Sequence, residues 1–244
     1  MRRFILLLFA CLLAMSVPTP AAARPLAVTV PQSFLGISYR ADGALNDQER
    51  YATFNAPDTV FNTPGLNCSG LVLAVSRKVL GTRLPIREVV RDRLGDSGPD
   101  SPLGHDWDFG FDFIMNIADG QNHALLLPVG EKMPSELTGR TAPGFDPHAA
   151  HFADDLLPRI AEGRLYLVSF SRRKTPDSPP HLHYHTGVIV RDGDAVWSYS
   201  TTHNSRRAIR INLADPQGLA KFRQSFRNTK GSYKRLTIIE VTPQ

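Results

Sequence analysis

The spacing of apolar residues changes near residue 164, and this change constrains the fold more than any other feature of the sequence. Residues 67–81 carry apolar side chains three and four positions apart, after the N-cap type residue Asn67 and before Gly81, which predicts a helix. After residue 164 apolar and polar residues alternate, which predicts strands. The alternating segments are 164–170, 183–190, 194–201, 207–212 and 235–241.

The order of these segments predicts an α+β fold in which the helix at 67–81 packs on an antiparallel sheet of about five strands. The turn sequence RDGD at 191–194 predicts a hairpin between the second and third strands. Further helices are predicted at 146–163 and 215–228. Residues 82–145 are rich in Gly, Pro and Asp, which indicates limited regular structure with two short strands at most. We expect a single domain with a long insertion at about 82–160.

The first 23 residues have the pattern of a secretory signal peptide. Two arginines precede an apolar run at 4–15, and a small-residue segment offers a cleavage site after Ala23. The apolar run is too short to span a bilayer. We therefore expect a mature protein of residues 24–244 that is periplasmic or secreted. A lipid anchor on Cys11 is the weaker alternative.

Loss of the signal peptide lowers the Lys+Arg count from 28 to 26, against 23 Asp+Glu, so the net charge falls from +5 to +3. A weak positive charge without blocks of Lys or Arg suits an anionic surface such as a cell wall and argues against a nucleic-acid partner. No later segment is apolar and long enough for stable insertion into a membrane.

Cys68 is the one cysteine that remains after cleavage, so it has no partner for an intramolecular disulfide. It falls in the first turn of the predicted helix, where the helix dipole and free backbone N–H groups favour the thiolate. A thiolate becomes a catalytic nucleophile when the fold brings a base, normally histidine, beside it. The alternative is an inert cysteine packed in the core.

Of the eight histidines, His185 has the most suitable position for that base. It begins a predicted strand, and the small residues Thr186 and Gly187 follow it and leave room on its face. A histidine at the end of a sheet, beside a helix that carries a cysteine, is the geometry of thiol hydrolases. The backbone N–H of Cys68 would then stabilise the oxyanion. The alternative is a structural histidine that bonds a loop.

Four motifs follow one another along the chain: LGISYR (35–40), NCSGLV (67–72), GRLYLVSF (163–170) and HTGVIVRDGDAVW (185–197). In this order they resemble the motifs of the NlpC-type papain-like cysteine peptidases, bacterial enzymes that cleave peptidoglycan stem peptides. The resemblance covers the core of the chain but not residues 82–160.

The resemblance implies a papain-like fold and an exported cysteine amidase or endopeptidase that uses no metal or other cofactor. It implies that Cys68 is the nucleophile, that His185 is the general base and acid, and that Tyr39 lines the substrate site. The chain departs from the family where Asn67 replaces an aspartate and Arg164 replaces an acidic residue, and its cysteine and histidine motifs lie farther apart. These departures bear on the choice of substrate more than on the type of reaction.

The family also has a third polar residue, on the strand that follows the histidine strand. We assign His203 to this role. Its rivals are Ser200 and Asn204. A hairpin that pairs Val190 with Ala195 would place His185 opposite Ser200, and a shift of one residue in the turn would reverse the face.

Two other functions remain open at this point. The sequence HLHYH at 181–185 would place His181, His183 and His185 on one face of a strand, which is the ligand set of an open zinc site in a zinc-dependent hydrolase. Pro179 and Pro180 argue against an extended strand at that point. The other possibility is a non-catalytic module that binds the cell wall, which would have no use for a nucleophile and a base together.

Overall fold

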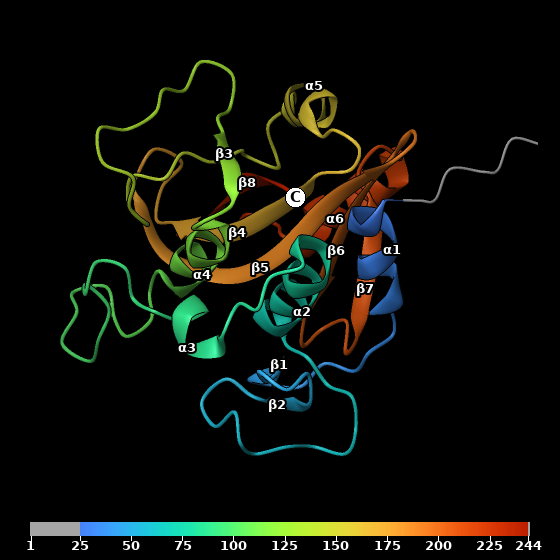
Figure 1. Cartoon of the computed structure of the whole chain (residues 1–244). Helices are drawn as coiled ribbons and strands as arrows, with labels where there is room; N and C mark the ends of the chain where they lie inside the picture. Colours follow the sequence, from blue (N-terminus) through green and yellow to red (C-terminus); the bar gives the residue numbers. More distant parts are fainter. Residues whose placement is uncertain (1–24, 244) are drawn as a thin grey trace, which may run out of the picture.

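The computed structural model describes residues 25–243, and its main element is a six-stranded antiparallel sheet (Figure 1). The predicted signal peptide lies outside the described residues. The strand order is β3-β8-β4-β5-β6-β7. The strands are β3 (Asn122–Leu126), β4 (Leu165–Arg173), β5 (Pro180–Asp192), β6 (Ala195–Thr201), β7 (Ala208–Asn212) and β8 (Tyr233–Thr242). A small separate sheet pairs β1 (Gly43–Leu45) with β2 (Tyr51–Thr53).

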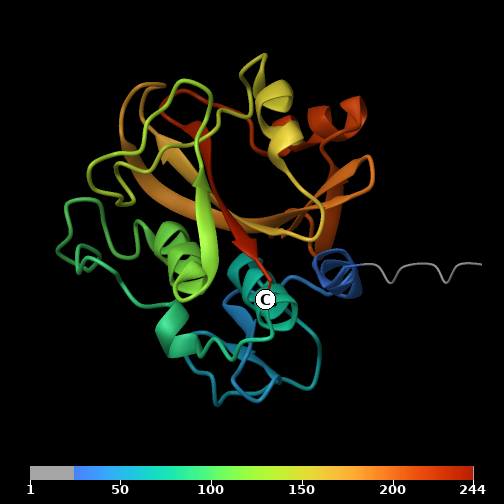
Figure 2. The same ribbon diagram turned by 45° about the horizontal axis from the view of Figure 1, so that its top comes forward.

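Helices cover both faces of the main sheet (Figure 2). One face carries α2 (Cys68–Leu80) and α4 (Phe109–Ala118), with α1 (Leu26–Ser33) and α3 (Ile86–Val89) at their sides. The other face carries α5 (Phe152–Leu156), which continues as a 3-10 turn (Leu157–Arg159), and α6 (Pro216–Ser225). None of the described helices is long and apolar enough to cross a membrane.

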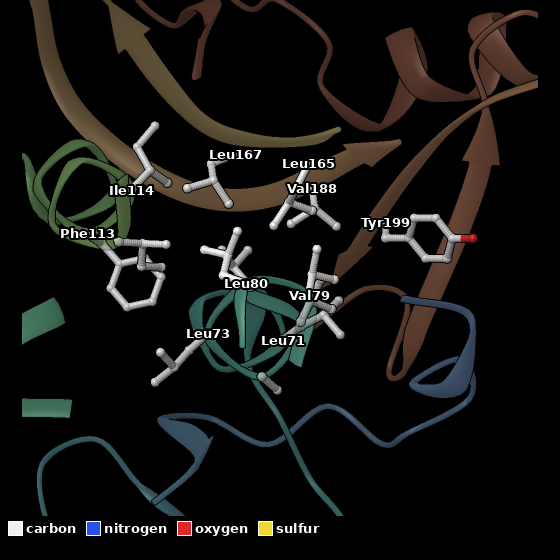
Figure 3. Packing of buried hydrophobic residues seen from close by; sticks show 14 of the residues in the cluster. Leu71, Leu73, Val79, Leu80, Phe113, Ile114, Leu165, Leu167, Val188 and Tyr199 are labelled. Atoms are coloured by element: carbon white, nitrogen blue, oxygen red, sulfur yellow. The ribbon is translucent and has the colours of Figure 1, made fainter. Parts of the chain in front are cut away.

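Alternation along the strands divides the core into two layers, as expected for a sheet buried on both faces. Leu165 and Leu167 of β4 face α2 and α4, whereas Tyr166 and Val168 face α5 and α6. Figure 3 shows the first layer, in which Val79 of α2 and Ile114 of α4 lie toward Leu167 and Val188 of β4 and β5. The expected α+β architecture, a helix that begins at Cys68 packed on an antiparallel sheet, is confirmed, with six strands rather than about five.

Local sequence explains why α2 begins and ends where it does. The Asn67 side chain accepts a hydrogen bond from the backbone N–H of Gly70 (2.7 Å), and Gly81 ends the helix in the left-handed region with φ 64°. Gly70 allows α2 to lie against β1, because a Cβ at this position would come within 2.0 Å of the Gly43 carbonyl oxygen. The start of α2 is therefore fixed in both position and direction.

β5 is longer than its neighbour β6, and this difference creates room for a site. β6 pairs with residues 188–192 of β5, while β4 pairs with β5 back to Pro180. Residues 180–187 therefore form an edge that no strand of the described chain covers on the β6 side. We call this segment the open edge of β5, and the N-terminus of α2 lies against it.

Three sequence predictions about the fold are wrong. Val190 pairs with Trp197, not with Ala195, because the hairpin turn is only two residues long, with Gly193 at φ 59°. The predicted helix at 146–163 is α-helical only at α5, since Pro158 has no N–H with which to continue it.

The third error concerns residues 82–145, where the sequence indicated two short strands at most and no helix. They contain α3 and α4, most of α4 is buried in the first core layer, and β3 extends the main sheet by pairing with β8. Phe109, Phe111 and Phe113 alternate along α4 as residues do in a strand, which hides the helical spacing of Asp112 and Asn116.

Candidate active site

A cavity of about 520 Å³ lies where the N-terminus of α2 meets the open edge of β5. Its lining comes from the β1 region, from α2, from the segment that leads into α4, and from β5. The lining residues include Asp42, Phe54, Asn55, Cys68, Ser69, His105, Asp106, Phe109, Tyr184, His185 and Thr186. The cavity therefore brings together the predicted nucleophile and the predicted base, although 117 positions separate Ser69 and Thr186 beside them.

Cys68 is the first residue of α2, and its side chain is partly exposed in the cavity. The first hydrogen bond within the helix runs from Leu71 N–H to the Asn67 carbonyl, so the backbone N–H of Cys68 is one of the donors that a helix start leaves free. The next residue, Ser69, bonds Thr186 of β5 through the two hydroxyl groups, 3.2 Å apart. This contact holds the thiol against β5.

The surroundings of Cys68 favour its thiolate. Burial raises the pKa of the thiol, but the charge of His185 and hydrogen bonds from His185 and Thr186 outweigh burial and lower the pKa to about 6. The thiol of Cys68 is thus ionised at neutral pH, which is the state in which sulfur attacks a carbonyl carbon.

His185 packs against aromatic rings. Its side chain is 6% exposed, and its ring centroid lies 5.0 Å from that of Phe170 and 5.5 Å from that of Phe226. The Nε2 atom is buried without a hydrogen-bond partner among the described residues. Apart from its hydrogen bond with the Cys68 thiol, packing orients this imidazole.

The register of the hairpin explains why β6 supplies no polar partner to His185. β6 ends at Thr201, and the chain then turns through hydrogen bonds between Thr202 and Ser205. Ser200 is buried on the side of Gly187, where a Cβ on that glycine would lie 3.8 Å from the Ser200 Cβ.

The remaining candidates, His203, Asn204 and Tyr39, lie outside the cavity lining. His203 and Asn204 are exposed in the turn after β6, and the ring of His203 packs edge-on against Tyr39 with centroids 5.9 Å apart. A catalytic role for His203 and a substrate contact by Tyr39 stay predictions.

The three histidines of β5 do not converge. A register shift at Tyr184 interrupts the alternation, so His183 faces α4 while His185 faces Phe170 and Phe226. Both ring nitrogens of His183 are engaged, by Ser169 Oγ at 2.9 Å and the Gly139 carbonyl at 2.8 Å, and burial lowers its pKa to about 4. Within residues 25–243, no group of three or more His, Cys, Asp or Glu side chains could hold a metal ion. The zinc alternative therefore has no ligand set in the described chain.

The strand at His181 is nevertheless extended. β5 begins at Pro180, a first-strand position at which proline is tolerated. The argument that the prolines prevent a strand there is wrong.

The cavity also contains residues that sequence patterns did not single out. Asp42 and Asp106 line it, both with positive φ (57° and 50°). No lysine or arginine of residues 25–243 is among the lining residues. The Nε2 of His105 lies 3.3 Å from Asp106 Oδ2. The Ser69–Thr186 contact could not be predicted from sequence patterns either. The one signal for it is that the two residues follow Cys68 and His185 in their motifs.

No known protein family matches the chain, and no curated protein matches it in sequence. Solved structures with a related chain path include an N-acetylmuramoyl-L-alanine amidase from Bacteroides uniformis, with TM-score 0.49 and 14% identity over 88% of this chain and 97% of that chain. Another is a Legionella pneumophila protein of the DUF1460 family, with TM-score 0.49 and 12% identity over 90% of each chain.

Proposed function

We propose that the chain is an exported cysteine amidase or endopeptidase that cleaves peptide bonds in peptidoglycan stem peptides. The observation that carries the reaction type is the pairing of Cys68, at a helix start, with His185, which lowers the thiol pKa to about 6. The substrate class rests on the four motifs of the sequence, and export rests on the signal-peptide pattern. The Bacteroides uniformis protein bears the name of an amidase, which is the reaction class proposed here.

In the proposed reaction the Cys68 thiolate attacks the carbonyl carbon of the scissile amide. The resulting oxyanion accepts a hydrogen bond from the backbone N–H of Cys68. The His185 imidazolium gives its proton to the leaving nitrogen, the C–N bond breaks, and a thioester remains. His185 then takes a proton from water, the hydroxide attacks the thioester, and the acid product leaves as the thiolate and imidazolium form again.

The cavity suits an extended peptide. Phe54 and Phe109 supply apolar surface, while Asn55, Asp42 and Asp106 supply polar groups. Polar groups at fixed positions among the apolar surface can set the register of a peptide chain relative to the nucleophile.

The test is digestion of purified peptidoglycan by the mature protein, with mass spectrometry of the products. Cys68→Ala and a chelator-treated sample run beside it. We expect new peptide termini that disappear with Cys68→Ala and survive chelation. Cleavage that only the chelator abolishes would contradict the thiol mechanism, and binding of peptidoglycan without any cleavage would favour the non-catalytic module.

A further inference from the structure

Positive charge is concentrated in one short part of the chain. Of the 26 Lys and Arg in residues 24–244, seven lie in residues 203–230, where Asp215 is the one acidic residue out of 23. The rest of residues 24–244 therefore has 19 basic against 22 acidic residues. Residues 203–230 have a net charge of +6, and the remainder has a net charge of −3.

The basic residues of this part lie on elements at one end of the sheet. Figure 1 shows β7 and α6 together at this end, whereas β3 lies at the other end. The start of α6 packs on the end of β7, since a Cβ on Gly218 would come within 2.0 Å of the Asn212 carbonyl oxygen. Arg210 of β7 and Lys221 of α6 line one open groove of about 410 Å³. We call four exposed residues the basic patch: Arg206, Arg207, Arg210 and Lys221.

The basic patch has no acidic partner within the protein that would explain it. Among residues 25–243, none of its four side chains forms an ion pair. Asp215 lines the same groove, but its carboxylate caps α6 by accepting a hydrogen bond from Gly218 N–H (2.7 Å). Arg210 contacts an uncharged group, the ring of Trp197, at 4.0 Å. Concentrated like charge opposes compact folding, so stability gives no reason for the patch.

The arrangement suits a polymer of anions better than a single anion. An exposed cation gains little from one counter-charge in water, whereas a polyanion contacts several cations at once and releases its bound counterions. Three of the four cations are arginines, whose forked donors match the oxygens of phosphate.

The patch lacks the apolar side chains that other anionic partners require. The exposed large apolar residues of the described chain all lie outside residues 203–230: Leu26, Leu94, Val129 and Met133. The patch therefore offers no apolar anchor for a membrane surface and no exposed aromatic ring to stack on a nucleic-acid base.

The basic patch begins near the candidate active site without being part of it. The backbone N–H of Tyr39 donates a hydrogen bond to the Arg206 carbonyl (2.8 Å), and Tyr39 also forms a β-bridge with Leu66, two residues before Cys68. No residue of the patch lines the cavity. A ligand on the patch would thus leave the cavity free.

We propose that the basic patch binds an anionic polymer of the cell surface in which phosphate groups repeat along the chain. The inference goes beyond the proposed function, because the patch takes no part in cleavage. Binding of the polymer would retain the protein at the cell surface and so raise its concentration there.

Titration calorimetry with inorganic polyphosphate of about 100 units tests the proposal without requiring turnover. We expect binding that weakens steeply as salt is added, and orthophosphate should bind at least about a hundredfold more weakly. The main variant carries Arg206→Gln, Arg207→Gln and Lys221→Gln and keeps Arg210, which packs on Trp197. It should bind polyphosphate about tenfold more weakly than the unmodified protein. Lys221→Gln alone, at an exposed position of α6, should bind about twofold more weakly.

The matched control removes three exposed cations outside the patch and so changes the net charge equally: Arg83→Gln, Lys132→Gln and Arg140→Gln. Its affinity for polyphosphate should stay within about twofold of the unmodified protein, and Tm is measured for every variant. An equal loss of affinity in the two triple variants would overturn the proposal, because net charge alone would then explain binding.

Two further probes separate the polymer from other ligands. Polyglutamate that binds as tightly as polyphosphate, with the same dependence on Lys221, would overturn the proposal by assigning the patch to carboxylate polymers. Vesicles of anionic phospholipid that bind through the patch, while polyphosphate does not bind, would overturn it by assigning the patch to a membrane surface.

Discussion

The hydroxyl groups of Ser69 and Thr186 lie 3.2 Å apart, and this contact joins the first turn of α2 to the open edge of β5. Cys68 and His185 immediately precede these two residues in the chain. The contact therefore sets how the candidate nucleophile and base face each other. Thr186 also bonds the thiol through its backbone and side chain, which lowers the pKa of Cys68.

Thr186→Val should raise the pKa of the Cys68 thiol, because it removes a hydroxyl that stabilises the thiolate and keeps a similar shape. One lost hydrogen bond of about 1 kcal/mol corresponds to roughly a fivefold loss in kcat/KM. The measurement is the rate of alkylation by iodoacetamide as a function of pH. Thr201→Val, at a buried hydroxyl with no hydrogen-bond partner in the described part of the chain, is the control and should leave the alkylation profile unchanged. An unaltered profile in Thr186→Val would remove Thr186 from the site.

His185→Gln should have a larger effect on the same profile. In the unmodified protein alkylation should rise with pH around a midpoint near 6, since the thiolate forms above the thiol pKa. Without the imidazole, burial still raises the pKa of the thiol, and among the groups named here only the hydrogen bonds of Thr186 still lower it. The midpoint should therefore move to about 8.5 or above. A midpoint that stays near 6 would mean that the helix start, not His185, ionises Cys68.

Phe226→Leu should lower kcat by about tenfold with little change in KM, because Phe226 packs on His185 and fixes the ring.

His203→Ala should keep kcat within about threefold, since His203 contacts Tyr39 at the surface. Steady-state kinetics on a muropeptide substrate would compare the two variants, with Tm measured for each. A hundredfold loss in His203→Ala at unchanged Tm would instead establish His203 as the third catalytic residue.

The elements of the fold that could be predicted from sequence are those with a clear period. α2 has a cap, a spaced apolar face and a glycine stop, and the strands from β4 onward alternate. α4 escaped prediction because Phe109, Phe111 and Phe113 alternate as residues do in a strand, although Asp112 and Asn116 recur at helical spacing.

Only the part of the candidate site that lies within the sequence motifs could be predicted. The NCSGLV and HTGVIV motifs located Cys68 and His185, but a register two residues from the expected one decided which β6 residues approach His185. Arg172 and Lys234 likewise become neighbours only because β4 pairs with β8, and no local sequence pattern indicates this. Such pairings depend on the order of the strands in the sheet. The spacing of apolar residues predicts strands but not this order.

Two buried aspartates at the start of α4 make the stability of the chain depend on pH. Asp108 and Asp112 are 1% and 4% exposed, and Asp108 Oδ2 and Asp112 Oδ1 have no hydrogen-bond partner among the described residues. Burial raises the pKa of Asp108 to about 6 and that of Asp112 to about 7. In the unfolded chain these groups ionise near pH 4. The free energy of unfolding should therefore be highest below pH 4 and should fall as the pH rises toward 7.

Asp112→Asn should therefore stabilise the protein at pH 8 and have little effect at pH 4. The amide oxygen can still accept the hydrogen bond from Arg93 N–H (2.7 Å), while the ionisation penalty is removed. The gain at pH 8 should be on the order of 3 kcal/mol, or roughly 5–10 °C in Tm. Thermal unfolding at the two pH values measures it, with Asp154→Asn, at an exposed position of α5, as a control that should shift Tm by less than about 1 °C. An equal gain at both pH values would show that the effect comes from packing and not from the buried charge.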